Sequence, residues 1–550
     1  ELASIANDLI WAAENTSGTS DDKTCLSNKT DAAVAYTAKV KESATAILAY
    51  QPAVSTAGSY EAGDNITEAR NYLNTIDEDT ASTTAGIATS VSTIETNGTQ
   101  EGKKTFTLTT GIDSFTGGSG GDTFDAGTAL SLGNGDVIDG KGGTDTITAK
   151  FTATTSTINI KNIEKFNITA TEAVTLNLAG STGITTITNQ GSTNNVTLNN
   201  LASLPTSVVI NTNDDNTTIN LANGALSGTD DLAITLEGTT SNSEIFITYA
   251  AGSSNDLETV SLISATASNV VKNIDTNGAD VATLEFTGSQ DLTISDILDT
   301  EVTTISAGSF TGDLSIKTAA VDVTSTLGSG ADTLVASTGD DVITGGAGAD
   351  VITLGTGTDS VSAGAGADTI IETSNGLTSL DTIAGGDGVD TLSVSDAATI
   401  IDNDFTSVTS VETLTTGLTN AAQTITLGSA ADAAGVATIT GNGTGVETVT
   451  VGAGFDNALT ISLGSGSAQS DDIDASASAA AITVTSTASA ITSADTILGG
   501  TGTADNIKIT ADSNATGAVF GASVTGVETI TVVAATTEDV KITTHDGNVT

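Results

Sequence analysis

The stretch GGAGADVITLGTGTDSVSAGAGADTII (residues 345–371) repeats the pattern Gly-x-Gly-x-Asp-x-aliphatic every nine residues. The aspartates in and around it keep that step over five copies, at Asp332, Asp341, Asp350, Asp359 and Asp368. One such unit cannot bury its own apolar residue, so neighbouring units must stack to form a core. We interpret each unit as a tight loop followed by a short strand, because glycines permit the left-handed conformations that such a loop needs.

The repeat predicts where the aspartates lie in space. Successive units occupy opposite sides of the stack, so one full turn takes two units. This predicts two columns of aspartates, one with Asp332, Asp350 and Asp368 and the other with Asp341 and Asp359. Neighbours in a column are expected about 4.8 Å apart, and carboxylates that close repel unless a cation lies between them. Several oxygen ligands in a flexible loop favour Ca²⁺ over Mg²⁺.

Further copies of the unit occur outside this stretch. GGDGVDTLS carries Asp390 after a break in the register, and GGSGGDTFD (117–125) carries Asp122. Two copies depart from the pattern: GKGGTDTIT (140–148), with Asp145, and GGTGTADNI (499–507), which has one inserted residue before Asp505 is reached.

The nonapeptides resemble the RTX (repeats-in-toxin) Ca²⁺-binding β-roll of proteins that Gram-negative bacteria secrete by the type I pathway. In that family the Asp of each nonapeptide and nearby loop carbonyls bind Ca²⁺ between turns. The resemblance implies the side-chain ligands Asp122, Asp332, Asp341, Asp350, Asp359, Asp368 and Asp390, with Asp145 and Asp505 as weaker matches. It implies carbonyl ligands at Gly346, Gly348, Gly355, Gly357, Gly364 and Gly366. The clear copies cover only a small part of the chain.

The composition excludes several kinds of partner. The formal net charge is −52, from 67 acidic and 15 basic residues. Nucleic acid and anionic membranes require a basic footprint, so neither is an expected partner. No run of about 18 apolar residues predicts a transmembrane helix. Only 3% of residues are aromatic and Met is absent, whereas Thr, Val, Ile and Ala are frequent. Short β-branched strands stacked in series need no large side chains.

These observations predict a mostly β protein: an elongated parallel β-solenoid or β-roll with a small all-α N-terminal domain. Segments such as ASTTAGIATSVSTIE (81–95) space their apolar residues by three and four, which is typical of helices. From Phe106 onward short alternating strands replace this pattern. The predicted parts are a helical domain (1–98), a linker with a first RTX-like segment (99–155), a β-solenoid (156–326), an RTX Ca²⁺-binding β-roll (327–395) and a β-solenoid with a late RTX-like turn (396–550).

A second, looser repeat places a turn residue and an aliphatic residue before a Glu that begins an alternating strand. Its copies are NIEKFNIT (162–169), DLETVSL (256–262), SVETLTT (410–416), GVETVTV (445–451) and GVETITV (526–532). We interpret these segments as solenoid rungs. We expect each Glu to be a solvent-facing carboxylate, with a ligand role as the alternative.

The sequence does not predict an enzyme. The only His is His545 and the only Cys is Cys25, so neither a zinc site of the His-Glu-x-x-His kind nor the usual Ser-His-Asp triad is expected. Parallel β-helices include polysaccharide lyases, but those usually need Arg or Lys near the substrate acid. From Phe166 onward the chain has only four Lys and no Arg, so a polysaccharide-active enzyme is the least favoured alternative.

A broader resemblance concerns the N-terminal region and the wider profile of the chain, which is rich in Thr, Ala and Gly, low in Lys and without Met. LSNKTDAAVAYT (26–37), followed by KKTFTLTTGIDSFTGGSGGDTFDAG (103–127), is similar to large Gram-negative surface-layer proteins such as those of Caulobacter and Campylobacter. This resemblance implies a secreted structural protein that assembles with itself on the extracellular cell surface, with Ca²⁺ as its cofactor. Cell-surface polysaccharide or lipopolysaccharide is a second candidate partner. One departure is the segment TTHDGNVT (543–550), which does not look like a type I secretion region.

A secreted RTX adhesin or polysaccharide-binding protein is the alternative function. For the assembling protein, the excess of acid predicts that contacts between subunits need cations, because like charges repel. The candidate interfacial ligands are the surface pairs Asp214-Asp215, Asp230-Asp231 and Asp471-Asp472.

Overall fold

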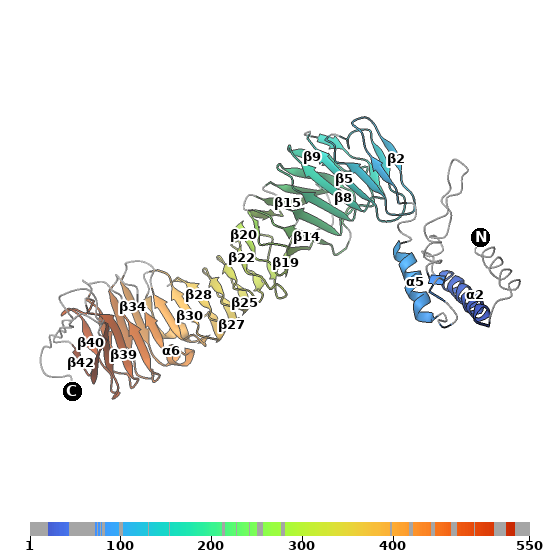
Figure 1. Cartoon of the computed structure of the whole chain (residues 1–550). Coiled ribbons are helices and arrows are strands. Elements are labelled where there is room, and N and C mark those ends of the chain that lie inside the picture. Colours follow the sequence, from blue (N-terminus) through green and yellow to red (C-terminus); the bar gives the residue numbers. More distant parts are fainter. Residues whose placement is uncertain are drawn as a thin grey trace. The chain divides into compact units, whose positions relative to one another are not determined.

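The fold consists of two compact units. The computed structural model describes residues 20–42, 72–73, 75–76, 79, 83–97, 103–129, 131–152, 155–211, 215–226, 228–240, 243–249, 257–276, 281–373, 375–396, 399–416, 422–441, 446–463, 470–488, 490–510 and 524–533. The first unit comprises Glu1–Ser207 with Asn220–Ala225, and the second comprises Val208–Ile219 with Leu226–Thr550. Figure 1 shows that strands dominate both units.

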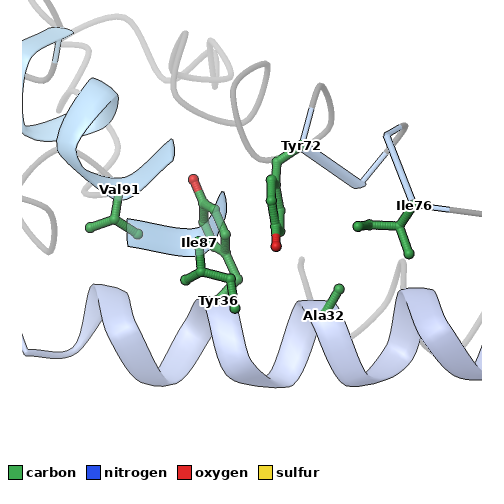
Figure 2. Close-up of a cluster of buried hydrophobic side chains, with 6 residues drawn as sticks. All are labelled: Ala32, Tyr36, Tyr72, Ile76, Ile87 and Val91. Atoms are coloured by element: carbon green, nitrogen blue, oxygen red, sulfur yellow. The ribbon is translucent and has the colours of Figure 1, made fainter. Parts of the chain in front are cut away.

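Two long helices, α2 (Ser20–Val40) and α5 (Thr84–Asn97), precede the strands of the first unit. Figure 2 shows the small apolar cluster that joins them: Ala32 and Tyr36 from α2 meet Ile87 and Val91 from α5. The ring of Tyr36 stacks on that of Tyr72, with centroids 5.4 Å apart. The other segments predicted to be helical within 1–98 lie outside the described residues, so the all-α N-terminal domain stays a prediction.

The rest of the first unit is built from parallel strands in three sheets. The pairing orders within the unit are β1-β3-β5-β8-β10, β2-β4-β7 and β6-β9-β11. The strand bounds are β1 Thr105–Thr107, β2 Ser114–Thr116, β3 Thr123–Ala126, β4 Val137–Asp139, β5 Thr146–Phe151, β6 Thr155–Thr157, β7 Ile160–Lys161, β8 Lys165–Ala170, β9 Val174–Asn177, β10 Thr186–Gln190 and β11 Val196–Leu201. Two more strands, β12 (Ser207–Asn211) and β13 (Thr217–Leu221), span the division between the units.

The second unit continues the same construction, with parallel pairing from one turn to the next. One sheet contains β14 Asp231–Glu237, β16 Thr259–Ala265, β19 Thr283–Gly288, β21 Thr304–Ser306, β23 Thr324–Thr326, β25 Val342–Ala347, β27 Ser360–Ala365, β29 Thr382–Asp387 and β32 Val408–Thr409. Beside it, β15 Glu244–Tyr249 pairs with β18 Asn273–Asp275.

Two further sheets complete the second unit. The longer contains β17 Asn269–Val271, β20 Leu292–Ile297, β22 Leu314–Lys317, β24 Thr333–Val335, β26 Val351–Thr353, β28 Thr369–Glu372, β30 Thr391–Val394, β33 Thr413–Thr416, β35 Thr438–Thr440, β37 Leu459–Ser462, β39 Ile482–Thr487, β41 Asn506–Thr510 and β43 Thr529–Val533. The shorter contains β31 Thr399–Ile400, β34 Gln423–Leu427, β36 Glu447–Val451, β38 Asp472–Asp474, β40 Thr496–Leu498 and β42 Val524–Thr525. A 3₁₀ helix, η1 (Asp402–Phe405), and a short helix, α6 (Ser429–Ala434), lie between strands.

The alternation of Thr with aliphatic residues explains why these segments form strands with one face inside. In β8 every second residue is buried, as expected when successive side chains point to opposite faces. Aliphatic residues at equivalent positions then stack from turn to turn. In one long stack the aligned residues are Ile316, Leu334, Ile352, Ile370, Leu392, Leu414, Ile439, Ile461, Val484, Ile507 and Ile530.

The parallel β-solenoid predicted from the sequence is confirmed. Among the described residues, no helix is long and apolar enough to cross a membrane. The predicted internal boundaries at 155/156, 326/327 and 395/396 stay predictions.

Candidate calcium sites in the acid columns

The aspartates of the nonapeptides end their loops directly before a strand and stack from turn to turn. The N–H of Asp332 donates to Oδ1 of Asp350 at 2.8 Å, and the N–H of Asp350 donates to Oδ1 of Asp368 at 2.8 Å. The N–H of Asp368 in turn donates to Oδ1 of Asp390 at 2.9 Å. We call such a set an acid column: the N–H of one acidic residue donates to the carboxylate of the acidic residue one turn later.

This first acid column (Asp332, Asp350, Asp368 and Asp390) begins where Asp332 accepts hydrogen bonds from the N–H groups of Leu314 and Gly328. A second acid column runs through Asp341, Asp359 and Asp381, with N–H to Oδ1 distances of 2.9 and 3.0 Å. The two columns are therefore the ones that the nine-residue step predicts. Both continue across the longer turn that interrupts the repeat, because Asp381 and Asp390 follow their predecessors by 22 residues.

A third acid column lies in the first unit. The N–H of Asp122 donates to Oδ1 of Asp145 at 2.6 Å, although the sequence around Asp145 departs from the nonapeptide pattern. Late in the second unit, Asp505 accepts hydrogen bonds from Ile482 and Gly500 without another nonapeptide beside it. All nine predicted aspartates are at most 3% exposed.

Burial leaves part of this negative charge without compensation. In five of the aspartates the second carboxylate oxygen, Oδ2, is buried and has no hydrogen-bond partner: Asp145, Asp341, Asp350, Asp368 and Asp390. A buried charged oxygen without a partner is strongly unfavourable. These five atoms are therefore the positions at which a bound cation would stabilise the fold most.

Main-chain carbonyls lie next to these oxygens. A Cβ added to Gly345 would lie 2.8 Å from Oδ2 of Asp350 and 2.2 Å from the carbonyl oxygen of Ala363, one turn later. Two acceptor oxygens therefore lie close to the same glycine, and one of them, Oδ2 of Asp350, has no hydrogen-bond partner. A cation satisfies both at once, and the absence of a glycine Cβ keeps the space between them open.

The glycine loops stack carbonyl groups in the same way. The backbone has positive φ at Gly346, Gly348, Gly364 and Gly366, where a side chain would be strained. Close approach adds a second requirement, because a Cβ on Gly366 would lie 1.5 Å from the carbonyl oxygen of Gly348.

The other two predicted loop glycines, Gly355 and Gly357, do not have positive φ. They are needed for space alone. A Cβ on Gly355 would lie 1.6 Å from the carbonyl oxygen of Ser337, and one on Gly357 would lie 1.9 Å from that of Gly339.

Burial also changes the acidity of the columns. Burial, with a smaller contribution from neighbouring carboxylates, raises the pKa of Asp341, Asp350 and Asp145 to about 6. The N–H groups that donate to the carboxylates act in the opposite direction. Nearby carboxylates and burial both oppose the charged form, so the charged columns require an external positive charge.

The donor set fits a hard cation bound partly by the main chain. Within the described part of the chain, no three His, Cys, Asp or Glu side chains gather closely enough to hold a metal ion by themselves. Aspartate oxygens must therefore act together with loop carbonyls, and an all-oxygen set of this kind suits Ca²⁺.

Four segments match the RTX calcium-binding nonapeptide repeat. They span residues 105–128, 326–361, 353–371 and 372–396, and they contain Asp122 and all of the first two acid columns. Comparisons with curated proteins and with solved structures find no match. RTX repeats bind calcium and are typical of secreted proteins. Asp145 and Asp505 lie outside the matched segments. The ligand roles of all nine aspartates and of the six glycine carbonyls stay predictions.

The structure corrects the expectation for the second repeat. Glu447 is buried, at 2% exposure. Glu164, Glu412 and Glu528 are half-buried, and their Oε2 atoms accept the N–H of Asp145, Asp390 and Asp505. None of these four is simply a solvent-facing carboxylate: Glu447 is buried, and the other three each accept the N–H of an aspartate one turn earlier.

Sequence reasoning also missed buried acids outside the clear nonapeptides. The N–H of Asp113 donates to Oδ1 of Asp136, and the N–H of Asp471 donates to Oδ1 of Asp495. Asp471 is 4% exposed, so its expected role as a surface ligand between subunits is wrong. The signal that could have revealed these residues is an acid at a constant step before a strand: Glu447, Asp471 and Asp495 are 24 residues apart.

Another missed acid is Glu372, which lies at the end of β28 beside the second column. Burial raises its pKa to about 7, and Asp359 and Asp381 contribute to this shift. Of the two residues considered for catalysis, Cys25 is a half-buried free thiol on α2, and His545 lies outside the described residues.

Proposed function

We propose that this chain is a secreted calcium-binding structural protein that assembles with copies of itself into a layer on the surface of a Gram-negative cell. The observation that carries the proposal is the stack of buried, unpartnered carboxylate oxygens inside a parallel solenoid. Bound Ca²⁺ supplies the positive charge that these oxygens need. The chain contributes the N–H groups that orient each carboxylate and the glycine loops that present carbonyl oxygens.

The described surface favours an assembling protein over a polysaccharide-binding one. The large apolar residues exposed there are aliphatic, for example Ile112, Ile297 and Leu380. The largest fully buried side chains include Phe124, Phe166 and other phenylalanines of the core. Sugar binding commonly uses exposed aromatic rings, which stack on the faces of the sugar, and the described residues keep most of their rings inside.

Charge supports a cation-dependent assembly. A chain with a net charge of −52 and only 15 basic residues repels its own copies and has few groups to form salt bridges between them. Three ion pairs occur among the described residues: Lys39–Glu42, Lys141–Asp139 and Lys272–Glu244. Contacts between copies therefore need a divalent cation. We propose no catalytic step for this chain.

The test is electron microscopy and light scattering of the purified chain in Ca²⁺, in chelator, and in NaCl of matched ionic strength. Ordered sheets or filaments in Ca²⁺ alone are expected. Monomers in all three conditions would contradict self-assembly, and particles of equal size in NaCl would show that simple screening suffices. Adding purified lipopolysaccharide to the Ca²⁺ sample tests the second candidate partner, because binding of dispersed monomers without assembly would favour the adhesin.

A further inference from the structure

The first and third acid columns each end on a glutamate from the second repeat. The N–H of Asp390 donates to Oε2 of Glu412 at 2.8 Å, 22 residues later. The N–H of Asp145 donates to Oε2 of Glu164 at 2.7 Å, 19 residues later. In each pair the glutamate takes the position that the next aspartate occupies inside a column.

The main chain before each glutamate has an unusual conformation. Two residues before the glutamates lie Ser410 and Asn162, with φ of 53° and 50°. Non-glycine residues rarely adopt positive φ; at the equivalent position before Glu528, Gly526 has φ of 70°. This conformation directs the carbonyl groups of Ser410 and Asn162 back toward the preceding turn.

These carbonyl oxygens meet the unpartnered oxygens of the last aspartates. A Cβ on Gly385 would lie 1.9 Å from the carbonyl oxygen of Ser410 and 2.6 Å from Oδ2 of Asp390. A Cβ on Gly140 would lie 2.2 Å from the carbonyl oxygen of Asn162 and 2.3 Å from Oδ2 of Asp145.

This arrangement repeats the one inside the column. There, Gly345 separates Oδ2 of Asp350 from the carbonyl oxygen of Ala363. Both terminal aspartates are 0% exposed, and neither Oδ2 has a hydrogen-bond partner.

We propose that Glu412 and Glu164 each complete a terminal Ca²⁺ site, in which the glutamate carboxylate and the carbonyl of Ser410 or Asn162 replace a nonapeptide. The second repeat therefore ends a calcium column without leaving the last aspartate uncompensated. This inference rests on the proposed calcium-binding function and assigns ligands that lie outside the nonapeptides.

Two other glutamates of the same repeat provide matched controls. Glu528 accepts the N–H of Asp505, but Oδ2 of Asp505 already accepts the N–H of Gly500. Glu258 accepts the N–H of Asp230, but Ala225 occupies the position five residues before Asp230, where a nonapeptide has its glycine. A Cβ on Gly499 would lie 1.9 Å from the carbonyl oxygen of Gly526 and 2.9 Å from Oδ2 of Asp505, so the Glu528 turn differs from the terminal sites in the donor that this Oδ2 already has. The Glu258 turn differs in lacking the glycine.

The experiment counts Ca²⁺ ions bound to the full-length chain by equilibrium dialysis and elemental analysis, for wild type and for Glu→Gln variants. Glu412→Gln and Glu164→Gln should each lose about one ion, and the double variant about two. Glu528→Gln and Glu258→Gln should lose none. Glutamine keeps an oxygen that accepts the aspartate N–H, so the fold is retained while the ligand charge is removed.

A second measurement separates a ligand from a purely structural acceptor. Amide hydrogen exchange of Asp390 and Asp145 in chelator should be the same in wild type and variants, while the protection that Ca²⁺ adds should fall in the variants. An unchanged ion count in the double variant, with ions present in wild type, overturns this inference alone. Equal losses in the two control variants also overturn it, and no bound ion in wild type overturns the calcium-binding function itself.

Discussion

Asp350 tests the reasoning about the acid columns most directly, because its two carboxylate oxygens have opposite surroundings. Oδ1 accepts the N–H of Asp332 at 2.8 Å, whereas Oδ2 is buried beside the carbonyl oxygen of Ala363 and has no hydrogen-bond partner. Asp350→Asn keeps an acceptor for Asp332 and replaces Oδ2 by an amide NH₂ that can donate to Ala363. Asp350→Ala removes both groups.

The two variants should therefore change the protection of segment 327–371 in opposite directions in chelator, and in the same direction in Ca²⁺. In chelator, the asparagine gains a hydrogen bond worth about 1 kcal/mol and removes a buried charge, so segment 327–371 should be more protected than in wild type. The alanine leaves the N–H of Asp332 buried without an acceptor, which costs about 1–3 kcal/mol. In saturating Ca²⁺ both variants should be less protected than wild type, because both remove a charged ligand from two successive turns.

The assay is amide hydrogen exchange of peptides from 327–371, in chelator and over a Ca²⁺ titration. A change of 1 kcal/mol corresponds to about fivefold in protection where exchange follows local opening. The order of protection expected in chelator is Asn, then Asp, then Ala. An asparagine variant that is less protected than wild type in chelator would refute the reasoning, since it would mean that Oδ2 is not an unsatisfied acceptor.

Three further predictions follow from the same columns. Gly366→Ala should cost roughly 2–4 kcal/mol in local opening free energy, because φ of Gly366 is 148° and its Cβ would lie 1.5 Å from a carbonyl oxygen, which combines backbone strain with overpacking. Gly133→Ala is the control, since no atom lies within 4 Å of its Cβ. Equal losses of hydrogen-exchange protection in the two variants would contradict the clash. Without Ca²⁺, the free energy of unfolding of 327–395 should fall as pH rises from about 4 to 7 and then level off, because burial raises the pKa of Asp341 and Asp350 to about 6 and the folded state therefore binds more protons than the unfolded one. Urea titrations in chelator across that pH range check the sign of this change. Ca²⁺ affinity should rise over the same pH interval. Asp332→Asn should lose fewer ions than Asp350→Asn in equilibrium dialysis, because Asp332 begins its column and its Oδ2 already accepts the N–H of Gly328; equal losses would indicate a site before the first turn.

The repeat predicted the columns because two repeat units have the same number of residues as one turn of the solenoid. In a stack whose turn takes two nine-residue units, residues 18 apart must share one column, as Asp332 and Asp350 do. The same logic did not reach Asp471 and Asp495. Their turn takes 24 residues, and no fixed pattern of glycines marks it, so the constant step between the acids is the one sequence signal and it is weaker than a nonapeptide.

By itself, the sequence determined the parallel solenoid, the two columns of the nonapeptide segment and the oxygen chemistry of their ligands. Alternating Thr and aliphatic residues and a constant step between aspartates are local properties that need no tertiary information. The tertiary structure decided the surroundings of each carboxylate oxygen: at Asp350 the N–H of Asp332 engages Oδ1, and the carbonyl of Ala363 lies near Oδ2. It also decided the place of Glu412. This glutamate looks solvent-facing in the sequence, and it ends a column only because its turn stacks on the turn of Asp390, whose N–H it accepts.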